Sequence, residues 1–354
     1  MSLNQAFPSQ DALAGELDTG SCRHTTAFFP SQAPLNTLAA RGTTVIDLAL
    51  RHAGLRRLTI RWECQGPVEA PVLIVQGGIS ATRHVAASRP FPEAGWWQEQ
   101  AGVGAALDTS RFRLLAIDWL GADGQLDVCI DPADQADAIA AVLDDLQVAR
   151  VQAFVGASYG AMVGLQFAAR HPARLARLIA ISGAHRSHAQ TTALRVIQRR
   201  IVKLGTQGQC ADEALALARA LAVIGYRSGA EFQQRFDAAP RIEAGSPRFP
   251  VEDYFDAVGS KFVARFSTTA YLRLSESIDL QRVDPASIGV PTELVAIAQD
   301  QIVPLADLVA LAAGIAAPVH LHRIDSLYGH DAFLKEKAAI AGILRRVLRD
   351  GVAS

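Results

Sequence analysis

The arrangement of residues 151–170 leaves few folds open to this chain. The apolar run VQAFV (151–155) leads into GASYG (156–160), and a segment with apolar residues at helical spacing follows at once. In a tight strand-to-helix turn, glycines keep side chains away from neighbouring backbone, and the strained serine is lifted above the sheet. The helix N-terminus beside it favours developing negative charge. The turn therefore predicts that Ser158 is a nucleophile.

Apolar runs of strand length recur along the rest of the chain. Two of them alternate apolar and polar residues, as half-exposed antiparallel strands do: residues 44–50 and 58–64. Six are continuously apolar, which is typical of strands covered on both faces: residues 71–76, 112–118, 151–155, 175–182, 292–298 and 319–324. Helical patterns lie at 134–146 and 162–170. This order predicts an α/β protein with one open, mostly parallel, doubly wound sheet.

One long segment interrupts the alternation. Residues 185–271 hold no convincing strand. They contain three helical patterns and then a Pro/Gly-rich break, at 191–204, 211–224, 230–236 and 240–250. We interpret this segment as a helical lid inserted into the sheet domain, whose two parts are residues 39–184 and 272–354. Residues 1–38 predict an irregular N-terminal arm.

The nucleophile needs a base, and the base needs an acid to orient it. In serine enzymes built on such a sheet, the chain order is serine, then Asp or Glu, then His. Asp300 follows the strand-like run TELVAIAQ, and His330 lies in SLYGHDAF, just past VHLHRID. Both come at the carboxyl edge of late strands, where Ser158 emerges. We predict a catalytic triad of Ser158, His330 and Asp300.

Other residues of the same types are less well placed. Asp118 and His84 precede the serine, which disagrees with the expected chain order. Asp325 and Asp331 lie close to His330 on the same strand end.

The oxyanion hole is expected from two backbone N–H groups. One belongs to the residue after the nucleophile, Tyr159, and the other to the loop after an early strand. That loop reads QGGIS (76–80), and its glycine pair lets a ligand approach the backbone closely. We predict that the second donor lies at Gly78 and Ile79.

Charge and composition exclude several other classes of protein. With 34 Lys+Arg against 35 Asp+Glu, the chain lacks the basic excess of a nucleic-acid binder. No stretch approaches the roughly 20 apolar residues of a membrane span, and residues 1–20 lack the segments of a secretory signal. Scattered cysteines without CxxC spacing indicate reduced thiols: Cys22, Cys64, Cys129 and Cys210. We expect a cytoplasmic protein without a metal site or a dinucleotide cofactor.

Three further stretches are specific enough to suggest a family. They are ALARALAVIGYRSGAEFQQRF (216–236), STTAYLRLSESIDL (267–280) and IDSLYGHDAFLKE (324–336). They resemble, in turn, the lid, the stretch before the last strands and the histidine segment of the homoserine O-acetyltransferase/O-succinyltransferase family, a branch of the α/β-hydrolase superfamily. The resemblance spans about residue 40 to the C-terminus and implies an α/β-hydrolase fold.

The resemblance also implies substrates and roles. Ser158 would take an acyl group from acyl-CoA and pass it to the hydroxyl of L-homoserine in a ping-pong cycle, a step of methionine biosynthesis. Arg219 would pair with the carboxylate of the amino acid and Asp331 with its ammonium, and Tyr226 would belong to the same substrate-binding site. Acyl-CoA would be a co-substrate, with no other cofactor. A homodimer through the helical region is implied as well.

Arg83, just past the glycine pair, is the sequence clue to the acyl group. The terminal carboxylate of a succinyl chain needs a cation, whereas an acetyl group needs only a small pocket. We therefore favour succinyl-CoA over acetyl-CoA. The basic run RVIQRRIVK (195–203) is more typical of a solvated helix face than of a site for the phosphates of CoA.

Three other functions remain open. O-acylation of serine, in cysteine biosynthesis, differs from that of homoserine by one methylene, a difference of only about 1–3 kcal/mol in selectivity. A serine esterase or other hydrolase would use the same triad. A non-catalytic binding protein is ranked last, because all three triad residues are present.

Overall fold

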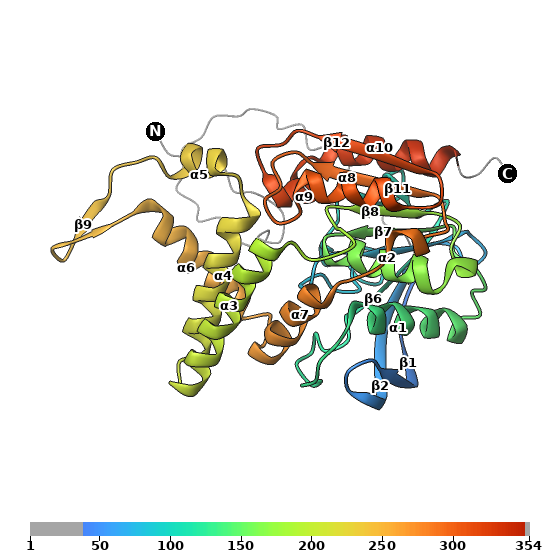
Figure 1. Ribbon diagram of the computed structural model, residues 1–354, viewed down its shortest axis with the longest axis horizontal. Helices are drawn as coiled ribbons and strands as arrows, with labels where there is room; N and C mark the ends of the chain where they lie inside the picture. Colours follow the sequence, from blue (N-terminus) through green and yellow to red (C-terminus); the bar gives the residue numbers. More distant parts are fainter. Residues whose placement is uncertain (1–37, 351–354) are drawn as a thin grey trace.

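The centre of the molecule is an eight-stranded sheet (Figure 1) in the order β1-β2-β6-β3-β7-β8-β11-β12. The computed structural model describes residues 38–350, so the arm predicted for residues 1–38 lies almost wholly outside the described residues. The strands are β1 (Ala39–Leu50), β2 (Gly54–Gln65), β3 (Val72–Gln76), β6 (Arg113–Ile117), β7 (Ala153–Ala157), β8 (Leu178–Ile181), β11 (Thr292–Ile297) and β12 (Val319–Ile324). β2 is antiparallel to both neighbours, and the six strands from β6 to β12 are parallel to one another. The predicted fold class is confirmed.

The continuously apolar strands separate two hydrophobic cores. In β3, Leu73 and Val75 face one core while Ile74 faces the other, because successive side chains of a strand point to opposite faces. Helices complete each core. One face is covered by α1 (Pro132–Asp145), α2 (Tyr159–Arg170) and α8 (Leu305–Gly314), and the other by α9 (Ala332–Lys335) and α10 (Lys337–Asp350). Both faces of the inner strands β3, β6, β7, β8 and β11 are therefore buried. The expectation that residues 319–324 are also covered on both faces is wrong, because β12 lies at the margin of the sheet and is largely exposed.

α1 begins two residues before the helical pattern predicted for it. Asp131 caps the helix by accepting the N–H of Ala133 at 2.9 Å, and the carboxylate of Asp134 accepts the N–H of Asp131 at 2.8 Å. Pro132 occupies the first helical position, where no N–H is needed. This capping box fixes where the helix starts after the loop that follows β6.

The chain between β8 and β11 forms a helical layer beside the sheet. It consists of α3 (Ala189–Gln207), α4 (Ala211–Tyr226), α5 (Gly229–Phe236), α6 (Pro250–Val263) and α7 (Thr268–Leu280). Figure 1 shows α3, α4 and α6 standing together at one side of the sheet, and α4 packs against both α3 and α6. The boundary expected at residue 271 falls inside α7, which begins at a Ser267 cap whose hydroxyl accepts the N–H of Ala270.

The prediction that residues 185–271 contain no strand is wrong. β9 (Arg241–Glu243) and β10 (Ser246–Arg248) pair as an antiparallel hairpin that projects from the helices (Figure 1). Its turn has φ of 50° at Ala244 and 80° at Gly245. Its residues are almost all exposed, so no burial pattern marks them in the sequence.

The remaining elements are short. β4 (Ala101–Gly102) pairs with β5 (Leu107–Asp108), and three 3₁₀ turns are η1 (Pro172–Arg174), η2 (Pro285–Ser287) and η3 (Gly329–Asp331). Within residues 38–350, none of the helices has the length and apolar character that crossing a bilayer requires.

Candidate active site

Ser158 occupies the turn between β7 and α2. Its backbone has φ 55° and ψ −117°, a conformation that is costly for a residue with a side chain. At the positions two residues before and two residues after Ser158, the neighbouring backbone leaves room for glycine but not for a larger residue. A Cβ on Gly156 would lie 2.3 Å from the carbonyl oxygen of Gly160, and a Cβ on Gly160 would lie 2.1 Å from the carbonyl oxygen of Gln76. Close packing of β7, α2 and β3 therefore holds the strained serine in place.

Hydrogen bonds join Ser158, His330 and Asp300 in a row. Oγ of Ser158 lies 2.8 Å from Nε2 of His330, and Nδ1 of the same ring lies 2.7 Å from Oδ2 of Asp300. The second oxygen of Asp300 accepts the N–H groups of Ile302 and Val303. Because a carboxylate only accepts, Nδ1 carries the proton and Nε2 is free to accept from the serine hydroxyl. The structure thus brings together three residues from the ends of β7, β11 and β12.

The environment of His330 makes it a stronger base than an ordinary histidine. Its side chain and that of Asp300 are both buried. Burial by itself lowers the pKa of His330, but the charge and hydrogen bond of Asp300, helped by the charge of Asp331, outweigh it and the pKa is raised. A raised pKa favours transfer of the serine proton to the imidazole.

The other acids and histidines considered for the triad lie in different environments. Asp118 binds Arg83, with Oδ2 lying 2.5 Å from Nη1. Nδ1 of His84 lies 3.0 Å from both carboxylate oxygens of Glu63. Asp325 is exposed at the end of β12. These contacts agree with the preference given to Asp300 and His330 on chain order.

The candidate oxyanion donors lie in the same small cavity as Ser158. Gly78, Ile79 and Tyr159 all line it. The carbonyl of Gly78 accepts the indole Nε1–H of Trp119 at 3.0 Å. All described peptide bonds are trans, so the C=O of Gly78 and the N–H of Ile79 point in opposite directions within one peptide plane. The N–H of Ala81 donates to the same carbonyl at 3.0 Å, so Trp119 and Ala81 together fix the direction of the Ile79 N–H.

Trp119 is a functional candidate that the sequence did not reveal. It lies in the loop after β6, next to Asp118. Its ring also packs edge-on against the ring of Tyr159, with centroids 4.9 Å apart. The buried Trp119 side chain thus contacts Tyr159 and Gly78, which belong to the two predicted parts of the oxyanion hole. In the sequence, only its position at the end of a strand could have indicated a role.

Two cavities meet at the site. The catalytic cavity, which contains Ser158, His330 and Asp331, has a volume of about 60 Å³. The outer cavity, lined by β2, the loop after β3, the loop after β6 and α6, has a volume of about 1370 Å³. Four residues line both cavities: Ile79, Ser80, Arg219 and Phe262. The small chamber at the serine therefore adjoins a much larger one.

Arg219 lies where the two cavities meet. Its guanidinium carbon is 5.4 Å from the ring centroid of Tyr226 and 5.0 Å from that of Phe262. Among the described residues, its Nε is buried and has no hydrogen-bond partner. The Tyr226 ring also lies 5.8 Å from the imidazole of His330. The structure thus places a cation between aromatic faces close to the base, and Phe262 is a neighbour that the sequence did not indicate.

Asp331 lines the catalytic cavity next to His330. Its Oδ2 forms an ion pair of 3.1 Å with Nε of Arg227, and Nη1 of Arg227 donates to Oε1 of Glu231 at 2.6 Å. Arg227 and Glu231 are buried, whereas Asp331 is partly exposed to the cavity. The carboxylate of Asp331 is therefore fixed from behind by α4 and α5.

Arg83 lies elsewhere than expected. Its backbone N–H donates to Oδ1 of Asp118 at 2.8 Å, while its guanidinium contacts Oδ2 of the same carboxylate. It lines neither the catalytic cavity nor the outer cavity. Asp118 neutralises Arg83, so the geometry gives no support to a contact between Arg83 and a succinyl carboxylate.

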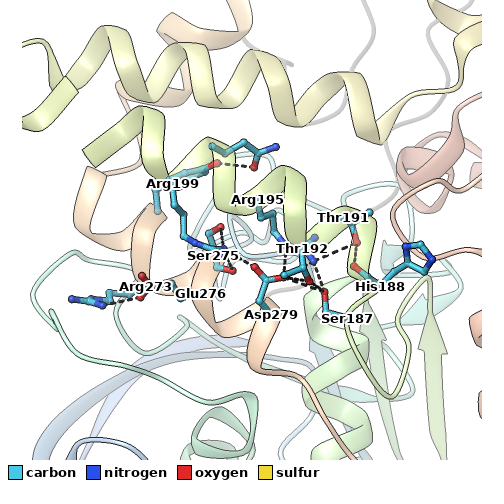
Figure 2. Close-up of polar contacts among 12 residues, drawn as sticks. Ser187, His188, Thr191, Thr192, Arg195, Arg199, Arg273, Ser275, Glu276 and Asp279 are labelled. Atoms are coloured by element: carbon cyan, nitrogen blue, oxygen red, sulfur yellow. Dashed lines mark hydrogen bonds and ion pairs between the residues drawn. The ribbon is translucent and has the colours of Figure 1, made fainter. Parts of the chain in front are cut away.

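The basic run on α3 is not a solvated face at Arg195 and Arg199. Figure 2 shows both guanidinium groups converging on the carboxylate of Asp279 in α7. Both arginines are buried, and Arg195 lines the catalytic cavity. Burial raises the pKa of Asp279, but the two arginines outweigh it and the pKa is lowered. Lys203, also on α3, has its Nζ 3.6 Å from Oε1 of Glu276 on α7.

This chain is similar to known proteins over most of its length. The family model of the α/β hydrolase fold matches residues 70–337. The homoserine O-succinyltransferase of Xanthomonas campestris pv. campestris is 56% identical over 312 residues, covering 88% of this chain and 84% of that protein. A serine O-succinyltransferase of Litchfieldella anticariensis is 30% identical over 351 residues, covering 84% of this chain and 94% of that protein.

A solved structure has the same architecture. The homoserine O-acetyltransferase of Bacillus anthracis matches with a TM-score of 0.79 at 15% identity, covering 88% of this chain and 98% of that one. At 15% identity this match shows the fold only. The family is shown by the family model and by the Xanthomonas relative, which both match most of the sequence. This chain belongs to the homoserine O-acetyltransferase/O-succinyltransferase family of the α/β-hydrolase superfamily.

Proposed function

We propose that this protein transfers a succinyl group from succinyl-CoA to the hydroxyl of L-homoserine, a step of methionine biosynthesis. The observation that carries the proposal is the 56% identity to a homoserine O-succinyltransferase over 88% of the chain. The hydrogen-bonded row of Ser158, His330 and Asp300 supports acyl transfer through a serine ester, because it supplies a nucleophile, a base and an orienting acid.

The first half-reaction forms the acyl-enzyme. Nε2 of His330 takes the proton of the Ser158 hydroxyl while Oγ attacks the thioester carbonyl carbon. The oxyanion that develops is stabilised by the N–H groups at Ile79 and Tyr159. The carbon–sulfur bond then breaks, and His330 passes its proton to the CoA thiolate. Asp300 keeps the imidazole in the required tautomer and stabilises its charged form.

The second half-reaction delivers the acyl group to the amino acid. His330 takes the proton of the homoserine hydroxyl, whose oxygen attacks the acyl carbonyl carbon of the serine ester. The bond to Oγ breaks, and His330 returns the proton to Ser158. In this proposal Arg219 pairs with the amino acid's carboxylate, and Asp331, held by Arg227, pairs with its ammonium.

The cavities suggest how the two substrates reach the serine. The outer cavity is large enough to admit the extended, thiol-bearing arm of CoA. It adjoins the catalytic cavity at Arg219 and Phe262. The small volume at Ser158 leaves little room for bulk water around the serine ester. Exclusion of water favours transfer over hydrolysis. Acyl-CoA is a co-substrate here, and no other cofactor is part of the proposal.

We also infer a cytoplasmic homodimer. Among the described cysteines, Cys64, Cys129 and Cys210 are all free, which supports a reducing compartment. Leu204 on α3 and Leu217 on α4 have 68% and 58% of their surface exposed, and exposed apolar side chains on neighbouring helices suit a contact with a second copy.

An activity matrix tests the proposal. Succinyl-CoA and acetyl-CoA are each combined with L-homoserine, with L-serine or with no acceptor, and CoA release is followed with a thiol reagent. The proposal expects the highest kcat/KM for succinyl-CoA with homoserine, and little release without an acceptor.

Each alternative has its own result in this matrix. Preference for serine would make the protein a serine O-acyltransferase. Equal release of CoA with and without an amino acid would indicate a hydrolase. No release under any condition would indicate a non-catalytic binding protein, and the variant Ser158→Ala supplies the background rate.

A further inference from the structure

His84, on the loop after β3, has acceptors beside both of its ring nitrogens. Nδ1 lies 3.0 Å from each carboxylate oxygen of Glu63 on β2, and Nε2 lies 2.8 Å from the backbone carbonyl oxygen of Glu93. Carboxylates and carbonyls only accept hydrogen bonds, and a neutral imidazole carries a proton on one nitrogen only. Both contacts are satisfied together when the ring is doubly protonated and positively charged.

Glu63 is the buried partner in this contact. It is 2% exposed, and a buried carboxylate is costly unless cations and donors compensate it. Nε of Arg41 on β1 donates to its Oε2 at 2.7 Å, and the amide of Gln65 donates to its Oε1 at 2.6 Å. Nη2 of Arg41 also lies 3.2 Å from Nδ1 of His84. A guanidinium and an imidazolium therefore share one carboxylate.

The charges around His84 favour its protonated form. Burial lowers its pKa, and so does the charge of Arg41. The hydrogen bonds to Glu63 and to the Glu93 carbonyl, with the charge of Glu63, outweigh both effects, so the pKa of His84 is raised. On the same loop, the side chain of Glu93 is exposed and that of Arg83 is neutralised by Asp118.

The segment that His84 ties to β2 supports the oxyanion loop. The backbone carbonyl of His84 accepts the N–H of Trp96 at 3.2 Å. The ring of Trp96 packs so closely on Gly77 that a Cβ there would lie 2.9 Å from it. Gly77 begins the turn that carries Ile79. Movement of the His84 segment therefore reaches the predicted oxyanion donor.

The same segment also supports the catalytic base. The N–H of Trp97 donates to the carbonyl of Val85 at 2.9 Å, and its indole N–H donates to the carbonyl of Phe333 at 3.0 Å. Phe333 lines the catalytic cavity and packs edge-on against the imidazole of His330, with centroids 6.0 Å apart. Trp96 and Trp97 thus connect one segment to both sides of the site.

We propose that His84 is a positioning residue, held as an imidazolium between Glu63 and the Glu93 carbonyl, which keeps the loop after β3 in the shape that the oxyanion hole requires. This inference rests on the proposed function, because it assigns His84 a part in that reaction. Loss of one proton leaves a nitrogen lone pair facing an oxygen on one side of the ring. The loop is then tied to β2 or closed on itself, but not both.

This arrangement should give the pH–kcat profile an alkaline limb. His330 acts as a base only when it is neutral, so kcat rises as the pH passes its pKa. For His84 the sign is opposite. Because folding raises its pKa, its stabilisation of the loop is complete below about pH 6.5, the ordinary value, and is lost as the pH rises through the raised pKa.

The test measures kcat against pH at saturating succinyl-CoA and homoserine, with Ser158→Ala as the background. His84→Gln is neutral and can donate on one side only. Below the pKa of His84, we expect its kcat to be about 10-fold under wild type, the lower end of the range for a hydrogen bond to a charged group. The ratio of wild type to variant should fall towards one as the pH rises, because the wild type then loses the same donor.

A second variant changes the partner and leaves the histidine in place. Glu63→Gln keeps the shape of the carboxylate but removes its charge, which helps to raise the pKa of His84. The alkaline limb should therefore move to lower pH. A residue with a purely structural role would not move this limb.

His171→Gln is the matched control. Nε2 of His171 lies 2.8 Å from Oδ1 of Asp137, so this variant also loses an imidazole that pairs with a carboxylate. His171 lines neither the catalytic cavity nor the outer cavity. Its variant should keep kcat within twofold of wild type at every pH.

NMR of ¹⁵N-histidine-labelled wild type observes the protonation directly, and the His84 signals are those missing from His84→Gln. Protons on both ring nitrogens at pH 6.5 are the expected result, and a single proton would overturn the inference. A ratio of wild type to His84→Gln that does not change with pH would overturn the positioning role. If His84→Gln does not fold, as judged by circular dichroism, the limb in Glu63→Gln decides, and a limb that stays in place counts against the inference. Wild-type enzyme that transfers no acyl group to homoserine would refute the proposed function itself, whatever the NMR spectrum shows.

Discussion

Replacing Gly160 with alanine probes how the nucleophile turn and the oxyanion loop are held together. The added Cβ would lie 2.1 Å from the carbonyl oxygen of Gln76 and 2.9 Å from that of Gly77. An ordinary contact begins at 3.4 Å, so the backbone must move by 1.3 Å to relieve the first clash. Neither neighbour is a flexible side chain, and therefore the loop after β3 has to shift.

The shift should affect activity more than stability. Overpacking of this kind costs about 1–3 kcal/mol in the free energy of unfolding. The N–H of Gly160 also donates to the carbonyl of Gly77 at 2.9 Å, so the movement passes directly to Gly78 and Ile79. Loss of one oxyanion donor lowers kcat by about 10²- to 10³-fold. We expect a kcat at least about 100-fold below wild type in a protein that still folds.

The assay follows CoA release together with unfolding in urea. Gly342→Ala is the matched control, because Gly342 is exposed in α10 and a Cβ there would meet nothing within 4 Å. This control should gain about 0.5–1 kcal/mol of stability and keep its kcat. A Gly160→Ala enzyme with a kcat within twofold of wild type would refute the reasoning.

Three further substitutions test the rest of the site. Trp119→Phe keeps the aromatic packing but removes one of the two donors to the Gly78 carbonyl, the other being the N–H of Ala81, so kcat should fall by about 10- to 100-fold with little change in KM; a KM that changes as much as kcat would contradict it. Asp300→Asn removes the charge that raises the pKa of His330, so the acid limb of the pH–kcat profile should move to lower pH while kcat falls by about 10⁴-fold; a limb that stays in place would count against this. Arg219→Met should raise the KM for homoserine by about 10- to 100-fold, and should affect the burst of acyl-enzyme formation less, as rapid quench can show.

The triad could be predicted because its residues follow local rules. Ser158 is marked by glycines two residues before and after it, and Asp300 and His330 follow the ends of β11 and β12 within a few residues. Chain order then selects them from the other acids and histidines. The sheet was equally accessible, since its inner strands are apolar without interruption.

Pairings between distant segments could not be predicted in the same way. Arg195 and Asp279 are 84 positions apart, and Arg83 and Asp118 are 35 apart. Nothing local to Arg195 distinguishes it from a solvated arginine, and nothing local to Arg83 shows that Asp118 binds it. The exposed hairpin Arg241–Arg248 escaped notice for a related reason, because no burial pattern marks its strands.

The order of the strands along the chain determines when, during synthesis, Ser158 meets its base. β11 and β12 are the last two strands at one margin of the sheet, and they carry Asp300 and His330 to a serine that precedes the histidine by 172 positions. During synthesis from the N-terminus, the strands from β1 to β8 emerge and pair first. On the proposed mechanism, an incomplete chain therefore carries Ser158 without its base. A truncated product cannot consume acyl-CoA, so the enzyme becomes active only when its final strands are in place.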